Sequence, residues 1–291
     1  MTKLKAKKKT KGKFPQKGFP WFLWLGIALV IVGIIAFVHI YRINQSSSVN
    51  LGEPKAAIID QLYTLQSNQA FIQQMTQELE DYGFEVDLYQ GDDVTVNLYR
   101  RLPSYRYKLV IFRAHFAVHG YEMIALQPHS GLLSGEGEII ERTCLFTNER
   151  YSQTKHVAEQ LGDQLAITRI DENHPLVFGI GDEFVTQSME GEFDNTVIIM
   201  AGCACLYLDD LARAFIDKGA STYLGWDANV DLSYVDDATI SLIQNLCTER
   251  CTVEKAVAKT MAEKGPDPYW KAVLQYYPSH SGSSTIAELI G

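Results

Sequence analysis

The chain has 291 residues, of which 46% are hydrophobic, and this is enough for one large folded domain or two small ones. The net charge of −9 hides an asymmetry, because eight lysines lie between Lys3 and Lys17. After Arg42, 17 of the 26 basic residues remain against all 35 acidic ones, a net charge of −18. We therefore expect no nucleic acid among the partners of the folded part.

The N-terminal region has the features of a membrane anchor. Residues 21–41 contain no Asp, Glu, Lys or Arg, and this length suits a helix that spans a bilayer. We expect residues 1–20 to be a basic cytoplasmic tail, residues 42–54 a polar linker, and residues 55–291 an α/β domain outside the cytoplasm. The competing interpretation is a cleaved signal peptide, but no small-x-small cleavage site follows Tyr41. The expected location is the cell membrane, crossed once.

The cysteines do not suggest a metal centre. There are five, an odd number, and no Cys-x-x-Cys pair or zinc-like spacing of cysteine and histidine is present. Cys247 and Cys251 are four residues apart and suit a disulfide poorly. We therefore expect neither a metal nor a cofactor.

From Lys55 onward, strand and helix patterns alternate, which predicts a mainly parallel sheet with right-handed crossovers. Asn68 and Gly83 are suited to begin and end the first helix, and Thr252 to cap the last long one. The aromatic tail Tyr269–Tyr277 is expected to pack on the domain. The expected strands are 56–63, 84–89, 107–114, 196–200 and 221–226, and the expected helices follow residues 68, 208, 236 and 252.

The middle of the chain, residues 116–194, is less regular. Tyr121–Leu126 and Gly137–Phe146 could form a hairpin around the glycine-rich turn Ser130–Gly137. Ser152–Leu161 has a helical pattern. Leu165–Ile170 and Glu183–Gln187 fit either helix or strand.

The segment Asn195–Leu206, NTVIIMAGCACL, joins a buried strand to a helix, which is where α/β folds place ligands and chemistry. Cys203 follows this strand, and the dipole of the next helix would favour its thiolate. Gly202 would let a substrate approach the backbone. His115 follows an earlier strand, so a Cys203–His115 pair could carry out nucleophilic acyl transfer. The alternative is that the cysteines are small core residues and the histidine is structural.

Three segments resemble the caspase-like cysteine peptidase superfamily, and within it the prokaryotic gingipain-like and CHAT-type domains. They are VIFRAH (Val110–His115), VIIMAGC (Val197–Cys203) and LARAFIDKGASTYLGW (Leu211–Trp226). The resemblance covers residues 55–264 in pattern and residues 195–226 closely. It implies a caspase-like three-layer α/β sandwich, with His115 as base and Cys203 as nucleophile. Phe116 stands where the family commonly has glycine, so His119, which precedes Gly120, and Cys205 remain as alternatives.

In such folds, the loop after the next strand helps to form the substrate pocket. Here this loop is Asp227–Asp237, which contains four aspartates, and Asp227 and Trp226 are the candidate substrate-binding residues. An acidic pocket would suit Arg or Lys in a substrate. The alternative is a solvated loop in which Asp236 caps the following helix.

The expected function is therefore that of a membrane-anchored caspase-like cysteine endopeptidase, which uses a His–Cys dyad to hydrolyse protein or peptide substrates. The main alternative is a non-catalytic caspase-like ectodomain that binds a ligand or a partner protein. A third interpretation, an amidotransferase-like hydrolase, usually carries its histidine late in the chain, whereas His115 precedes Cys203.

Overall fold

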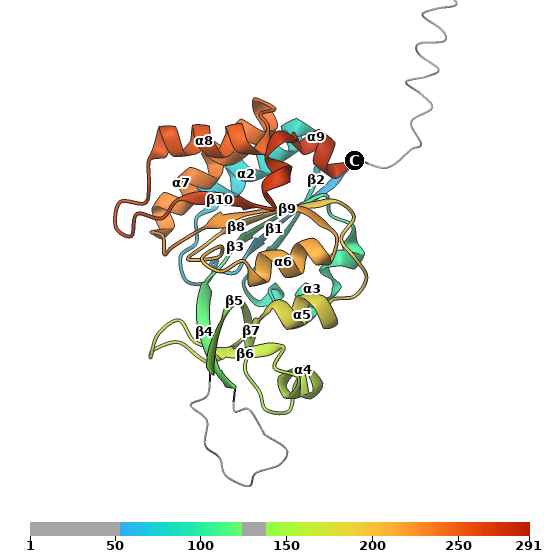
Figure 1. Ribbon diagram of the computed structural model, residues 1–291, viewed down its shortest axis with the longest axis vertical. Helices are drawn as coiled ribbons and strands as arrows, with labels where there is room; N and C mark the ends of the chain where they lie inside the picture. The colour runs from blue at the N-terminus through green and yellow to red at the C-terminus, as the bar shows by residue number, and fades with distance from the viewer. Residues whose placement is uncertain (1–52, 124–137) are drawn as a thin grey trace, which may run out of the picture. The chain divides into compact units, whose positions relative to one another are not determined.

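The structure is a computed structural model that describes residues 53–123 and 138–291 (Figure 1). The expected basic tail, the membrane anchor, nearly all of the linker and the turn Ser130–Gly137 therefore lie outside the described residues. None of the helices in the described ranges is both long and apolar enough to cross a membrane.

The core of the domain is a six-stranded sheet in the order β10-β9-β8-β3-β1-β2. All neighbouring strands are parallel except β10, which runs antiparallel to β9 at one edge. The strands are β1 (Lys55–Asp60), β2 (Glu85–Gln90), β3 (Leu109–Arg113), β8 (Thr196–Ala201), β9 (Ala220–Trp226) and β10 (Leu274–Tyr277). The predicted mixed α/β fold with a mainly parallel sheet is confirmed.

Burial explains the position of each strand in this sheet. Every residue of β3 and β8 is buried, as expected for central parallel strands that are covered on both faces. At the edge, no residue of β2 is buried. The central strands are therefore the ones whose sequences are continuous apolar runs, and these runs made them recognisable.

Helices cover both faces of the sheet (Figure 1). On one face lie α2 (Gln69–Tyr82), α7 (Leu232–Ile243) and α8 (Val253–Lys264), and on the other lie α3 (Val96–Arg101) and α6 (Asp210–Asp217). The other α-helices in the described ranges are α4 (Val157–Leu161), α5 (Asp182–Gln187) and α9 (Ile286–Ile290), and the short helical turns there are Gly91–Asp93, Leu102–Tyr105, Gln244–Thr248 and Ser279–Ser283.

The predicted caps of α2 are confirmed. The Asn68 side chain accepts a hydrogen bond from Phe71 N, and Gly83 ends the helix with φ +113°. The start of α7 was predicted wrongly, because the helix begins at Leu232 and is capped by Asp231, not Asp236. Asp231 accepts hydrogen bonds from the N–H groups of Ser233 and Tyr234.

A second, antiparallel sheet has the order β4-β5-β7-β6 and follows β3 in the chain. The predicted hairpin is confirmed by the pairing of β4 with β5, although β4 begins five residues earlier than expected. The helix predicted over Ser152–Leu161 begins only at Val157. The strands of this sheet are β4 (Phe116–Met123), β5 (Glu138–Arg150), β6 (Leu165–Thr168) and β7 (Val177–Ile180).

Candidate functional site

His115 and Cys203 follow two neighbouring strands at the same register. Arg113 at the end of β3 pairs with Ala201 at the end of β8, and Ala114 N donates to Ala201 O at 3.3 Å. Each candidate residue lies two positions beyond this last pair. The fold therefore brings the two main chains together at the carboxyl edge of the parallel sheet, as the strand pattern predicted.

Gly202 is required by the backbone of the neighbouring strand. A Cβ atom at this position would overlap the carbonyl oxygen of Ala114 and come within 2.5 Å of the Phe116 ring. The explanation offered from the sequence, close approach of a substrate, is therefore replaced by close approach of β3 to β8. Cys203 is the next residue, so its main chain follows directly on this close approach.

The Cys203 thiol is half-buried and donates a hydrogen bond to Val230 O at 3.4 Å. Burial raises its pKa, and the nearby carboxylates of Asp267 and Asp231 raise it further. The prediction that a helix dipole stabilises the thiolate is wrong. The next helix, α6, begins seven residues later, at Asp210. Among the described residues, none accepts a hydrogen bond from Cys203 N–H.

Cys205 is a core residue. It is fully buried, its sulfur accepts a hydrogen bond from Trp226 N at 3.1 Å, and its thiol lies 3.3 Å from Gly202 O. Burial raises its pKa to about 12. These contacts give Cys205 a structural role and leave Cys203 as the more accessible of the two thiols.

His115 is also half-buried, and its backbone N–H donates to Gln61 Oε1 at 3.0 Å. Its ring centroid lies 6.0 Å from that of Phe146. Burial lowers the pKa of His115, and the charges of His174 and Arg113 lower it further, which favours the neutral imidazole. In the described part of the chain, no hydrogen bond joins this ring to Cys203. The alternative, His119, lies opposite Arg142 in the β4–β5 pairing.

A buried ion network, which was not predicted from the sequence, lies beside His115. The Arg113 guanidinium is fully buried and donates to both carboxylate oxygens of Asp236, at 2.7 and 2.9 Å. It also donates to Asp60 Oδ1 at 2.8 Å. Burial lowers the pKa of Arg113, but these two carboxylates raise it by more and keep the guanidinium charged. An arginine inside an apolar strand was the available signal, because a buried charge requires a partner.

The predicted substrate-binding residues have internal contacts. Asp227 accepts hydrogen bonds from Val273 N at 2.7 Å and from Gln275 Nε2 at 3.0 Å. The Trp226 side chain is 1% exposed and packs edge-on against Tyr234. The other loop aspartates are also occupied, since Asp231 caps α7, Asp236 binds Arg113, and Asp237 pairs with Lys264 at 2.7 Å.

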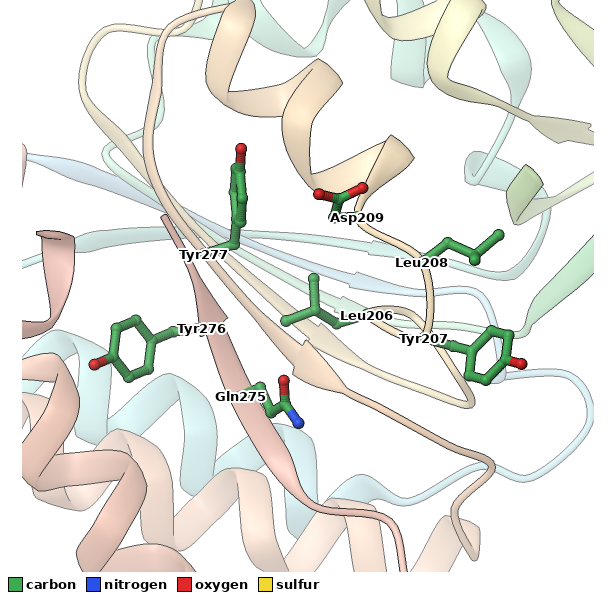
Figure 2. Close-up of a pocket in the computed structure, with 7 residues that line it drawn as sticks. All are labelled: Leu206, Tyr207, Leu208, Asp209, Gln275, Tyr276 and Tyr277. Carbon is green, nitrogen blue, oxygen red and sulfur yellow. The ribbon is translucent and has the colours of Figure 1, made fainter. Parts of the chain in front are cut away.

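Two open hollows lie near the Cys203 segment. The first, which we call the Trp270 hollow, has a volume of about 310 Å³ and is lined by Val118, Ala204, Tyr207, Ala228, Asn229 and Trp270. The second has a volume of about 350 Å³ and lies between β10 and the segment that leads into α6 (Figure 2). Tyr207 lines both hollows. Of the expected aromatic tail, β10 packs on the sheet, whereas Tyr269 and Trp270 are exposed.

Within the described ranges, no group of three or more His, Cys, Asp or Glu side chains is arranged to hold a metal ion. All five cysteines are free thiols, Cys247 and Cys251 included.

Comparison with models of known protein families found no match for this chain. Comparison with curated proteins also found none.

Proposed function

We propose that this protein is a cysteine endopeptidase in which Cys203 attacks the peptide carbonyl carbon and His115 transfers the protons. The observation that supports this best is the common register of the two residues beyond the paired ends of β3 and β8. A nucleophile and a base that follow adjacent parallel strands lie at the edge of the sheet where α/β enzymes bind their substrates.

We propose further that the fold is a caspase-like three-layer sandwich. Helices on both faces of the sheet, the strand order and the antiparallel edge strand β10 are consistent with this type of domain. The Leu211–Trp226 segment, on which the resemblance depends most, forms α6 and β9 directly after the Cys203 segment.

The proposed reaction begins from a neutral thiol and a neutral imidazole. His115 accepts the thiol proton as the sulfur forms its bond to the carbonyl carbon, and the Cys203 N–H donates to the developing oxyanion. His115 then returns the proton to the departing amine, which leaves an acyl-enzyme that water hydrolyses. This sequence requires the His115 ring to turn toward Cys203 once a substrate is bound, because the hydrogen bond is absent in the free protein.

The test is the cleavage of an unstructured protein substrate by the full chain and its variants. Cys203→Ala should reduce cleavage at least ~10³-fold, and His115→Ala should reduce it about 10²- to 10⁴-fold. The double variant should cleave the substrate as fast as the less active of the two single variants, because the two residues act as one unit. His119→Ala and Cys205→Ala are the matched controls. Retained cleavage in a folded Cys203→Ala protein would eliminate the proposed nucleophile.

A second candidate function is a binding domain without catalysis. It is favoured by the Cys203 thiol, which donates to Val230 O and has a raised pKa. If the wild-type chain binds peptides but cleaves no substrate, this alternative replaces the first.

A further inference from the structure

The carboxylates that were expected to form a basic-residue pocket bind other groups of the protein. Asp227 is bound by Val273 N and Gln275, and Asp236 neutralises the buried Arg113. Asp237 pairs with Lys264 across the protein surface. None of these three lines the Trp270 hollow.

The Trp270 hollow adjoins Cys203 on two sides. Ala204 is the next residue in the chain, and Ala204 N donates to Ala228 O at 2.8 Å, so these two lining residues lie side by side. The Cys203 thiol is bonded to Val230 O, and Asn229, the residue before Val230, lines the same hollow. A peptide bond positioned for attack by Cys203 would therefore place a neighbouring side chain at this opening.

The lining of this hollow is mainly apolar, apart from Asn229, and contains no charged residue. Ala204, Ala228 and Val118 are small, whereas Tyr207 and Trp270 are large and 58% and 53% exposed. Large aromatic surfaces that remain in water beside an apolar hollow gain most from contact with an apolar ligand.

Trp270 is held in its exposed position by its own loop. The fully buried Asp267 accepts hydrogen bonds from Tyr269 N at 2.9 Å and Trp270 N at 2.7 Å. It also accepts one from Asp231 N at 2.8 Å, which ties the loop that carries Trp270 to the start of α7. A preorganised aromatic wall costs less entropy on binding than a mobile one.

From these observations we infer that the Trp270 hollow binds a large apolar side chain of the peptide substrate, next to the bond that Cys203 attacks. This rests on the proposed endopeptidase function. The Asp231 and Asp267 carboxylates give the Cys203 region a negative potential, so acidic side chains are disfavoured there. The hollow of Figure 2 is not assigned, because neither Ala204 nor the loop after β9 lines it.

The experiment uses the full chain and quenched Gly/Ser peptides in which one Phe, Leu, Ala, Arg or Asp is moved through successive positions around the cut bond. At one position, Phe and Leu should raise kcat/KM about 10- to 100-fold over Ala, with Asp below Ala. Trp270→Ala and Ala228→Trp should each bring the Phe-to-Ala ratio close to one. Tyr269→Ala is the matched control, because Tyr269 is exposed beside Trp270 but lies outside the hollow, and it should keep the ratio.

Binding of the same peptides to the Cys203→Ala chain, measured by calorimetry, separates the two proposals. Cleavage with equal rates for Phe and Ala, or with a preference for Arg, overturns the apolar assignment and leaves the endopeptidase standing. Binding of Phe peptides that is lost in Trp270→Ala supports the hollow, even if the wild type cleaves nothing. A chain that neither cleaves nor binds Phe peptides eliminates both proposals.

Discussion

At the scale of single residues, the buried Arg113 is the side chain whose loss of a partner should have the largest effect. Its guanidinium joins β3 to β1 through Asp60 and to α7 through Asp236. Asp60 still balances the charge when Asp236 is removed, but two buried N–H donors of the guanidinium then lose their acceptors, which typically costs about 1–3 kcal/mol for each unsatisfied group. Asp236→Ala should therefore lower the free energy of unfolding by roughly that amount in urea denaturation.

Its neighbour Asp237 provides the control for this prediction. The Asp237 side chain is 63% exposed, and its pair with Lys264 lies at the surface. Such pairs contribute about 1 kcal/mol or less, so Asp237→Ala should change stability little. If Asp236→Ala and Asp237→Ala change the free energy of unfolding equally, the buried Arg113 network does not stabilise the fold.

The pH dependence of Cys203 reactivity should be the opposite of that expected for the stabilised thiolate inferred from the sequence. Burial raises the pKa of its thiol above the ordinary value of about 8.5, so the neutral form persists at higher pH in the folded chain than in the unfolded one. The rate of iodoacetamide labelling at Cys203 should therefore rise only in alkaline solution. Any stability linked to this pKa shift is present below the unfolded pKa and is lost as pH rises through the folded one.

Mass spectrometry of labelled peptides measures this in a Cys251→Ser background. Cys144, Cys205 and Cys247 should react later than Cys203, because burial raises each of their pKa values to about 12. Full labelling of Cys203 near pH 6 would instead indicate a thiolate paired with an imidazolium.

At the scale of elements, the strands could be read from the sequence far better than the site. The apolar runs placed β3 and β8 to within about two residues, because both strands are buried on both faces. The start of α7 was misplaced because aspartate is a typical N-cap residue, whereas Asp236 binds Arg113, which is distant in the chain. Local pattern contains no information about such a partner, and it also left the pairing of β6 with β7 undetected.

The close approach of the residues that follow β3 and β8 can be tested through Gly202. An added Cβ would meet the Ala114 carbonyl, a backbone atom that cannot rotate away, and overpacking of this kind costs about 1–3 kcal/mol. Gly202→Ala should therefore lower the urea midpoint. Gly181→Ala is the control, since the nearest atom to its added Cβ lies 4.0 Å away. An unchanged midpoint in Gly202→Ala would show that the two strand ends can separate at little cost.

At the scale of the whole molecule, the chain divides into two units, residues 1–52 and 53–291. The second unit contains the complete described core, so the fragment 53–291 should fold by itself. The first unit contains the apolar stretch 21–41 with its lysine-rich flank, which is typical of an anchor whose N-terminus stays in the cytoplasm. We therefore expect the full chain in membranes and the fragment in solution.

Protease added to intact spheroplasts tests this topology. If the acidic domain lies outside, it should be digested, while an epitope placed before Lys3 should be protected until detergent opens the membrane. Replacement of the eight lysines by Gln removes the positive flank, and it should reverse the orientation in part of the population because positive charge sets the direction of insertion. A domain protected in the wild-type chain, or a full chain released from membranes by carbonate, would contradict the anchor.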